Sequence, residues 1–241
     1  MALKIITQPI QEPVTMAEAK LHLRVETDDD DTLIAGHIMA ARKYCEEYQN
    51  RSYAQQEIEL TLDDWPQCGS YPIEIPRPPI MSVEWVKYYG TDNTEYIWDP
   101  LLYLADTDSE PGRICPAFGQ IYPTLQLRPM NGVKVRYIAG YDPVIKIVTI
   151  PAGTTPAPVA ETVVNADGSI TVTVLNSDGS ATATTTDYCA NVSKTIKQAI
   201  LLLIGVWYKN REAVISERGV VPAEIEFTVK ALLDLNRVIP I

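Results

Sequence analysis

Histidine, phenylalanine and cysteine are scarce in this chain of 241 residues, which has two His, two Phe and four Cys. The cysteines lie far apart, with no C-x-x-C pair and no His at metal-ligand spacing, so the usual zinc motifs are excluded. They are Cys45, Cys68, Cys115 and Cys189. We interpret them as reduced thiols of a cytosolic protein and predict neither a metal nor a cofactor.

Positive charge and long apolar runs are also lacking. Lys and Arg total 20 against 31 Asp and Glu, for a net charge of -11, which argues against a broad surface that grips phosphates. The longest strong apolar run, 199–208, is shorter than the ~20 residues of a membrane span. The N-terminal stretch, with Pro9 interrupting a short apolar run, does not fit a secretory signal, so we expect neither export nor a membrane.

Motifs of known enzymes are missing. The sequence has no G-x-S-x-G, Walker loop, G-x-G-x-x-G or H-E-x-x-H pattern. His22 and His37 both lie on expected helices without an obvious catalytic companion. We therefore predict that the protein is not an enzyme.

Two groups of carboxylates remain as candidates for acid–base or metal chemistry. Asp63 and Asp64 are adjacent, and Asp106, Asp108 and Glu110 fall in "DTDSEPG". Their chemistry would need the carboxylates to come within about 5–10 Å of each other, which sequence cannot show. The second group is typical of a tight loop, because Asp and Ser side chains bond nearby backbone and Pro-Gly completes a turn.

Helical patterns open the chain. Thr15 followed by Glu18 indicates a capping box, so a short helix should run to about Val25. A second helix should follow the four aspartates 28–31 and end near Asn50, because apolar residues then recur at three- and four-residue steps. Aspartates at a helix start accept hydrogen bonds from the free backbone N–H groups, and the positive end of the helix dipole stabilises their negative charge. A weak cation site is the alternative interpretation of the run.

The middle of the chain alternates with period two. Segments from Gln55 to Tyr137 predict antiparallel strands, with "GTDN" (Gly90 to Asn93) as a hairpin turn. Residues 145–187 are rich in Thr, Val and Ala and contain two DG turns, each followed by an alternating strand. We expect a protruding hairpin or small β insert there, and a disordered linker is the alternative.

Helical periodicity returns near the end. An apolar stripe runs from Ile196 to Trp207, and Pro222 should lie in the first turn of a last helix. The predicted fold class is α+β, with the terminal helices packed together in a single unit. The expected domains are a helical bundle of 1–54 and 188–241, an antiparallel β region of 55–144 and a Thr/Val/Ala-rich β insert or flexible protrusion of 145–187.

Several stretches together resemble the head-tail connector (adaptor) proteins of tailed bacteriophages and gene transfer agents, in their longer branch with a β insertion. The stretches occur in the order that the family has. They are "EPVTMAEAKLHLRVETDDDDTLIAGHIMAARKYCEEY" (12–48), "RPPIMSVEWVKYY" (77–89), "DTDSEPGRI" (106–114), "VKVRYIAGY" (133–141) and "ILLLIGVWYKNREAV" (200–214). The long Thr-rich stretch between Tyr141 and Asn191 departs from a typical member.

The resemblance implies a structural virion protein without a reaction. Such a protein forms a ring of twelve copies below the portal, joins head to tail around the DNA channel, and contacts the portal above and a tail-side neck or terminator protein below. It belongs to the virion neck and is made in the cytoplasm of the bacterial host. DNA would pass through without sequence-specific binding, and the net charge favours an acidic inner face.

Two sets of residues are the candidate partner contacts. Apolar residues near the C-terminus would dock on the portal, because a monomer in solution would otherwise hide them. They are Leu235, Val238, Ile239 and Ile241. Trp207, Tyr208 and Arg211 would form the bundle or ring interface. The rival interpretation is a carbohydrate- or receptor-binding accessory module of a phage particle, supported by the Thr-rich β segment and the spread of Tyr and Trp.

Overall fold

The computed structural model describes residues 1–66, 72–151, 161–165, 169–178, 180–209 and 223–238, with the backbone alone for 223–227. These residues form four α-helices and three antiparallel sheets. The chain divides into two compact units instead of the expected single one. The first contains Met1–Pro9, Asn50–Tyr141 and Arg237–Ile241, and the second contains Ile10–Gln49 and Asp142–Asn236.

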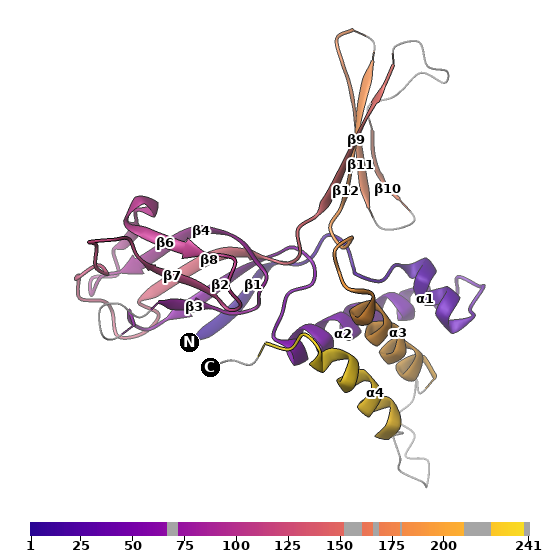
Figure 1. The fold of residues 1–241 in the computed structure, drawn as a ribbon, viewed down its shortest axis with the longest axis horizontal. Helices are drawn as coiled ribbons and strands as arrows, with labels where there is room; N and C mark the ends of the chain where they lie inside the picture. Colours follow the sequence, from indigo (N-terminus) through magenta and orange to yellow (C-terminus); the bar gives the residue numbers. More distant parts are fainter. Residues whose placement is uncertain (67–71, 152–160, 166–168, 179, 210–222, 239–241) are drawn as a thin grey trace. The chain divides into compact units, whose positions relative to one another are not determined.

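Two antiparallel sheets build the first unit (Figure 1). The larger contains, in spatial order, β1 (Ala2–Thr7), β2 (Gln56–Leu62), β8 (Val133–Ala139), β4 (Ile80–Tyr89) and β5 (Glu95–Trp98). The smaller contains β3 (Ile73–Ile75), β7 (Gly112–Pro116) and β6 (Tyr103–Asp106), and the short 3-10 helix η1 (Pro100–Leu102) precedes β6. The turn expected over Gly90 to Asn93 is confirmed: the Gly90 N–H donates to the carbonyl of Thr94 over 3.1 Å, and Asn93 has a positive φ of 63°.

The core of the first unit comes from residues that alternate along its strands. On β8 every second side chain from Val133 to Ala139 is buried, as the period of two requires. One apolar cluster draws residues from both sheets, among them Ile58 of β2 and Ile114 of β7. Tyr137 is buried in it and donates its hydroxyl to the carbonyl of Pro76 over 2.9 Å. This unit therefore has a hydrophobic core of its own.

Strand β1 corrects the assignment of residues 1–54 to a helical bundle. Ala2–Thr7 pairs antiparallel with β2, and Ile5 lies opposite Ile58. The alternation of β1 is too short to be distinct, and its partner lies about fifty residues further along the chain. Only the tertiary pairing makes this segment a strand.

Four helices belong to the second unit. They are α1 (Met16–Leu23), α2 (Asp31–Gln49), α3 (Lys194–Lys209) and α4 (Ala223–Asp234). The predicted capping box is confirmed, because Glu18 N–H donates to Thr15 Oγ1 over 3.2 Å and Thr15 N–H donates to Glu18 Oε2 over 2.9 Å. Pro222, expected in the first turn of the last helix, lies outside the described residues. Among the described helices, none has the length and apolar character to cross a membrane.

Apolar stripes hold these helices together. Helix α2 packs against α3, and α3 packs against α4. The buried side chains include Ile34, Ile38, Ala41 and Cys45 of α2, Ile196, Ala199, Ile200 and Ile204 of α3, and Val229 and Leu233 of α4. The spacing of three and four residues in each helix places these side chains on one face.

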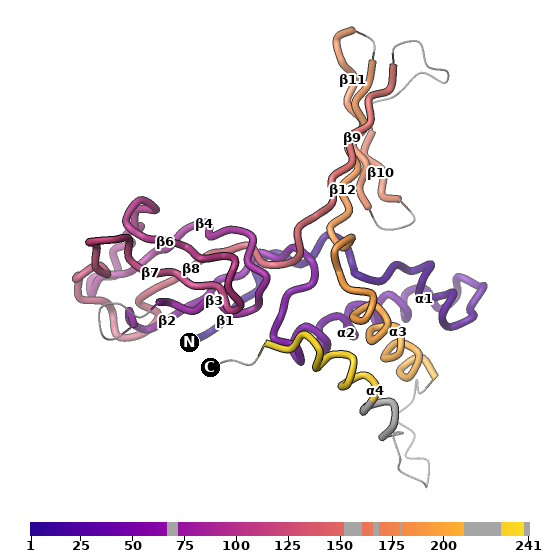
Figure 2. The backbone as a smooth tube through the Cα atoms, viewed as in Figure 1, coloured from indigo at the N-terminus to yellow at the C-terminus, as the bar shows by residue number. Residues whose placement is uncertain are grey.

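The second unit also contains the third sheet, formed by the Thr-rich segment (Figures 1 and 2). Its strands, in spatial order, are β10 (Glu161–Val164), β11 (Ile170–Leu175), β12 (Ala181–Asp187) and β9 (Val144–Ile150). All three neighbouring pairs are antiparallel. The base of β12 is tied to the segment before α1, because Gln11 Nε2 donates to Asp187 Oδ1 over 2.9 Å.

Candidate functional site

The C-terminal end of α3 contacts α2 through its aromatic residues. The Trp207 ring lies 6.2 Å from the His37 ring and meets Tyr44 edge-on, with 6.5 Å between centroids. The Tyr208 hydroxyl donates to Asp30 Oδ2, just before α2, over 2.6 Å. Both aromatics therefore help to join the helices within one copy. Arg211, the third residue of this candidate interface, lies outside the described residues.

The end of α4 is anchored to the end of α2. Gln49 Nε2 donates to the carbonyl of Leu233 over 2.5 Å, and the Tyr48 hydroxyl donates to Asp234 Oδ1 over 2.8 Å. Gln49 is fully buried, so this bond fixes where the helix stops. Leu235 directly follows this anchored helix end, and its side chain is largely exposed.

The residues expected to dock on the portal differ in exposure. Leu235 is 70% exposed, whereas Val238, in the first unit, is only 8% exposed. The buried Val238 differs from the expectation of an open apolar side chain. Ile239 and Ile241 lie outside the described residues. Leu235 is therefore the described residue of this set that is free to contact a partner.

Apolar side chains remain uncovered on the described helices. Leu21 of α1, Leu33, Met39 and Tyr44 of α2, and Leu235 after α4 are each more than one third exposed. Trp207 adjoins this surface through Tyr44 and is itself half-buried. Exposed apolar surface of this kind typically marks a protein–protein contact.

A buried ion cluster lies inside the helical part of the second unit. Arg42 and Glu46 of α2 are each about 1% exposed; Arg42 donates from Nη1 to Glu46 Oε2 over 2.6 Å and from Nε to Glu12 Oε2 over 2.7 Å. Burial by itself would lower the pKa of Arg42, but the two carboxylates outweigh it and raise that pKa. Sequence reasoning missed this cluster. The available signal was a pair of opposite charges four residues apart beside the apolar stripe of α2.

The four aspartates 28–31 lie where α2 begins, with Asp31 in its first turn. Lys20 Nζ lies 2.5 Å from Asp28 Oδ1 and 2.5 Å from Asp31 Oδ1. The hydrogen bond from Lys20, followed by its charge, lowers the pKa of the Asp28 carboxyl. A lysine thus serves as the counter-ion of the run. In the described part of the chain, no group of three or more His, Cys, Asp or Glu side chains could hold a metal.

The second carboxylate group forms a turn, as the loop interpretation predicted. Asp106 Oδ1 accepts the N–H groups of Asp108 and Ser109, and Arg113 Nη2 lies 2.6 Å from Asp106 Oδ2. The hydroxyl of Ser109 and the guanidinium of Arg113 lower the pKa of Asp106 strongly. Glu110 is occupied by an ion pair with Arg51. These acids are therefore used in holding loops together.

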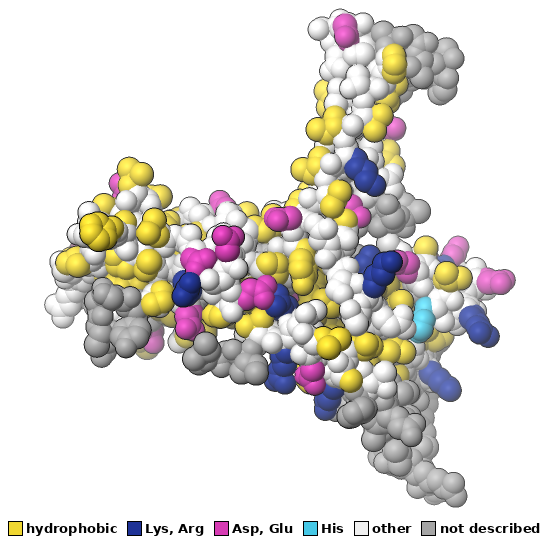
Figure 3. All heavy atoms as spheres, in the orientation of Figure 1, with side chains coloured by type: hydrophobic (Ala, Val, Ile, Leu, Met, Phe, Trp, Pro, Cys, Tyr) yellow, Lys and Arg dark blue, Asp and Glu magenta, His cyan; other side chains and the backbone are white. Residues whose placement is uncertain are grey.

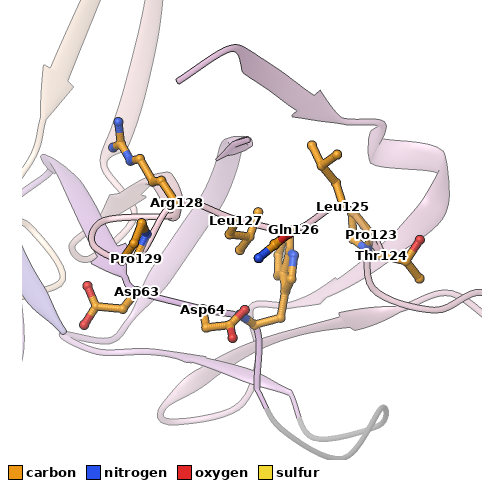
Figure 4. A pocket seen from close by; sticks show the side chains of 10 residues that line it. Asp63, Asp64, Pro123, Thr124, Leu125, Gln126, Leu127, Arg128 and Pro129 are labelled. Carbon is orange, nitrogen blue, oxygen red and sulfur yellow. The ribbon is translucent and has the colours of Figure 1, made fainter. Parts of the chain in front are cut away.

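Asp63 and Asp64 line a cavity of about 660 Å³ together with Gln126 and Arg128, and their carboxyl groups point away from one another (Figure 4). Asp63 Oδ1 accepts the N–H of Asn131 over 2.9 Å, and Asp64 Oδ1 accepts the N–H of Trp65 over 2.8 Å. Each acid is thus used in a local backbone contact. The pair does not present two converging carboxylates to a substrate.

Two of the four tryptophans are used in packing. Trp65 and Trp98 are nearly buried and meet edge-on at 5.2 Å, and Trp65 also stacks on Tyr122 at 5.2 Å. A sugar-binding platform requires an aromatic face open to solvent. These rings therefore contribute to the core of the first unit and leave no open platform.

The comparisons with known proteins point in one direction. Residues 13–88 match the model of the phage gp6-like head-tail connector protein family, which confirms the resemblance for that part of the chain. No curated protein matches the chain. Among solved structures, a chain from the neck of the empty GTA particle computed with C6 symmetry is similar at a TM-score of 0.65 and 17% identity. That match covers 100% of this chain and 97% of the other.

Two further structures give the same result. A chain from the virion of the native gene transfer agent (GTA) particle matches with a TM-score of 0.63 and 16% identity, and one from the neck of the native GTA particle computed with C12 symmetry with 0.63 and 17%. Each match covers 100% of this chain and 97% of the other. The chain thus has the fold of these particle proteins along its whole length, and residues 13–88 carry the match to the phage gp6-like head-tail connector family.

Proposed function

We propose that this protein is a structural head-tail connector (adaptor) of a tailed bacteriophage or phage-like particle. It forms a ring below the portal, joins head to tail and lines the DNA channel, and it catalyses no reaction. The observation that carries the proposal is the likeness of fold over the whole chain to proteins of GTA necks and virions. The match of residues 13–88 to the connector family supports it independently.

The exposed surface of the helices supports ring formation. A ring needs two different patches on each copy that meet by rotation, so each isolated copy must expose apolar surface. Met39 and Tyr44 of α2 provide such surface beside Trp207. We expect this region, with Tyr208 and Arg211, to contact the neighbouring copy. Twelve copies would agree with the C12 symmetry of one related neck.

The net charge suits a channel for DNA. With -11 per copy, twelve copies would carry a large negative charge, and phosphates that pass a wall of carboxylates do not adhere to it. We expect Asp and Glu to outnumber Lys and Arg on the inner face of the ring. A cryo-EM map of the ring checks this, and an inner face lined mainly by Lys and Arg would contradict it.

The residues after α4 would dock on the portal. Leu235 is exposed immediately after an anchored helix end, which gives it a fixed position from which to enter an apolar pocket. Leu235→Asp, and separately deletion of 236–241, should weaken binding to purified portal at least tenfold in a pull-down or surface-binding assay. Leu101→Asp, which alters a leucine of the first unit that is 85% exposed, is the matched control. Unchanged binding by both C-terminal variants would reject this docking role.

The overall function is tested in particles. Host cells that produce the particle without this protein should accumulate separate heads and tails, and a plasmid copy of the gene should restore joined particles. Electron microscopy of negatively stained lysates checks this. Joined, infectious or DNA-transferring particles in the absence of the protein would refute the proposal. Measurement of mass with and without purified portal then determines whether the ring forms alone or on the portal.

A further inference from the structure

The Thr-rich sheet has two open edges. Its spatial order is β10-β11-β12-β9, so β10 and β9 are the outer strands. Within the described residues, each of these strands pairs with one neighbour only. An outer strand presents a row of N–H and C=O groups to which another chain can add. Among the residues that the structure describes, the sheet is therefore paired inside and unpaired along both outer strands.

The number of strands makes these two edges compatible with each other. Because the sheet has four strands and every neighbouring pair is antiparallel, β10 and β9 run in opposite directions. When a second copy is generated by rotation about an axis parallel to the strands, its β10 has the same chain direction as β10 of the first copy. Its β10 would therefore run antiparallel to β9 of the first copy. An odd number of strands would have given a parallel junction.

The side chains of the edges favour a partner over solvent. Strand β9 ("VIKIVTI") has seven residues, no proline and one charge, and its Ile145, Ile147 and Val148 are each more than half exposed. Val164 of β10 is 70% exposed. Long apolar edges of this kind are blunted in proteins that stay monomeric. The only charges within the two strands are complementary, Lys146 on β9 and Glu161 on β10.

One face of the sheet carries no charged residue. Residues directly opposite each other across an antiparallel pair share a face, so the pairing of the four strands defines it. Its side chains are all Val, Ile or Thr, and Ile145, Ile147 and Val164 are each more than half exposed. Figure 3 shows hydrophobic side chains along the exposed surface of this sheet. A neighbouring β10 that continues this face must place Thr162 and Val164 opposite two of Ile145, Ile147 and Thr149, because a shift of one residue would exchange the faces.

Two registers pair all four residues of β10 with β9 and continue the uncharged face: Glu161 lies opposite Val148 in one and opposite Ile150 in the other. Only the first also brings Glu161 next to Lys146, so we adopt it. With Glu161 opposite Val148, Thr162 lies opposite Ile147 and Val164 lies opposite Ile145. All four residues of β10 are then paired, and the uncharged face continues from copy to copy. Glu161 also becomes the diagonal neighbour of Lys146 on the opposite face, a separation that long side chains span.

We propose that β9 of each copy pairs antiparallel with β10 of the next copy in this register, so that the Thr-rich sheets join edge to edge into one continuous sheet around the ring. The inference rests on the proposed ring function, and it assigns the inserted sheet to contact between copies. Backbone hydrogen bonds give the junction strength, and the Lys146–Glu161 pair helps to set its register.

Cysteine cross-linking tests the junction directly. Val148→Cys combined with Glu161→Cys should give a ladder of disulfide-linked multimers under mild oxidation, up to the number of copies in the ring. Within one copy these positions are on opposite edges, three strand spacings or about 14 Å apart, which is too far for a disulfide. A bond between them must therefore join two copies. The parent chain, treated in the same way, gives the background from the native cysteines.

The matched control is Ile147→Cys combined with Glu161→Cys, which places the two thiols on opposite faces and should give at least tenfold less ladder. Assembly of each unoxidised variant is followed separately by native mass spectrometry, alone and with purified portal. Rings that form while neither pair cross-links would overturn the edge-to-edge junction and leave the ring standing. Equal ladders from both pairs would overturn the register. Absence of any assembly, with or without portal, would overturn the ring and the junction together.

The charge pair provides a second test. Lys146→Glu should weaken assembly by placing two acids together, and Lys146→Glu combined with Glu161→Lys should restore it. Both residues are exposed, so neither change should alter folding, which circular dichroism checks. Assembly that is insensitive to Lys146→Glu, or that is not restored by the exchange of charges, would contradict the junction.

Discussion

Two of the sheets contain similar strands but bury their side chains to different degrees. They are the larger sheet of the first unit and the Thr-rich sheet of the second. Strand β8 alternates between buried and half-buried residues, and its inner side chains enter a core shared with the smaller sheet. Every residue of β9 is at least partly exposed. Both sheets satisfy the backbone bonds between their own strands, but only the first also buries its apolar side chains.

Charge placement explains the difference. The outer face of the larger sheet carries Arg136, which is paired with Glu57 over 2.8 Å and with Glu59 over 2.7 Å, so it can remain in water. One face of the Thr-rich sheet has no such ladder, and each exposed Ile or Val leaves about 1.5–3 kcal/mol of burial unrealised. We infer that the first unit is complete in one copy and that the Thr-rich sheet is completed by assembly.

The largest expected effect tests whether the interior of the helices, unlike the Thr-rich sheet, is shielded from water. Arg42→Ala should reduce the free energy of unfolding of the second unit by about 3–5 kcal/mol, because the buried Glu46 would lose its ion pair with Arg42. Urea unfolding followed by circular dichroism measures this. The double variant Arg42→Met, Glu46→Leu should recover most of the loss. A single variant as stable as the parent chain would show that the helical interior is open to water.

A matched pair of isoleucines compares the two sheets themselves. Ile58 of β2 is 1% exposed and Ile147 of β9 is 68% exposed. Ile58→Ala should destabilise the first unit by about 2–5 kcal/mol, because it leaves a cavity. Ile147→Ala should change the stability of the unassembled chain by less than about 0.5 kcal/mol. Tryptophan fluorescence and circular dichroism during urea unfolding measure both, and equal losses would erase the distinction between the sheets.

Local signals in the sequence predicted local structure well. The Thr15–Glu18 capping box, the aspartates before α2 and the turn at Gly90 to Asn93 depend on neighbours within a few residues. The apolar stripe ending at Trp207 was readable for the same reason. Each of these rests on backbone preferences that act within one or two turns of chain.

Features that depend on distant partners were not predictable. Strand β1 exists because it pairs with β2, and the division into two units follows from contacts across the whole chain. In β9, apolar residues occupy both faces, so no period of two marks the strand. The contrast between the exposed Leu235 and the buried Val238 is likewise set by tertiary packing, which their similar side chains do not reveal.

Acid should weaken the outer face of the larger sheet. Hydrogen bonds from Arg136 and Thr7 lower the pKa of Glu57. Burial by itself would raise the pKa of Glu59, but hydrogen bonds from Arg136 and Lys134 outweigh burial and lower that pKa. Carboxylates with a lowered pKa stabilise the fold above their unfolded pKa of about 4.5, and this contribution is lost as the pH falls through their folded values. The urea midpoint of the first unit should therefore decline from pH 5 to pH 3.

The variant Glu57→Gln, Glu59→Gln should be less stable at pH 7 and should lose less of its remaining stability over the same pH range. Asp106, whose pKa is also lowered, still contributes in this variant, so the slope should be reduced but not abolished. Tryptophan fluorescence at pH 5, 4 and 3 measures the midpoints. A slope as steep as that of the parent chain would mean that the ladder does not govern acid stability.

The smallest expected effect concerns how fast the thiols of the two units react with an alkylating reagent. Burial raises the pKa of Cys45 to about 12, and the charge of Glu46 adds to this effect. Burial also raises the pKa of Cys189 to about 12, and the charge of Asp187 adds to it. The thiolate is the reactive form, so at pH 8 both should react with iodoacetamide at least roughly a thousandfold more slowly than an ordinary exposed cysteine. Cys115 of the first unit, which is partly exposed, should be alkylated well before them.

Peptide mass spectrometry over time measures the alkylation rate of each cysteine. In 8 M urea the three should react alike, which would show that folding and not local sequence protects them. Alkylation of Cys45 or Cys189 as fast as that of Cys115 would mean that the helical interior opens readily, and the contrast with the exposed Thr-rich sheet beside it would then be one of degree.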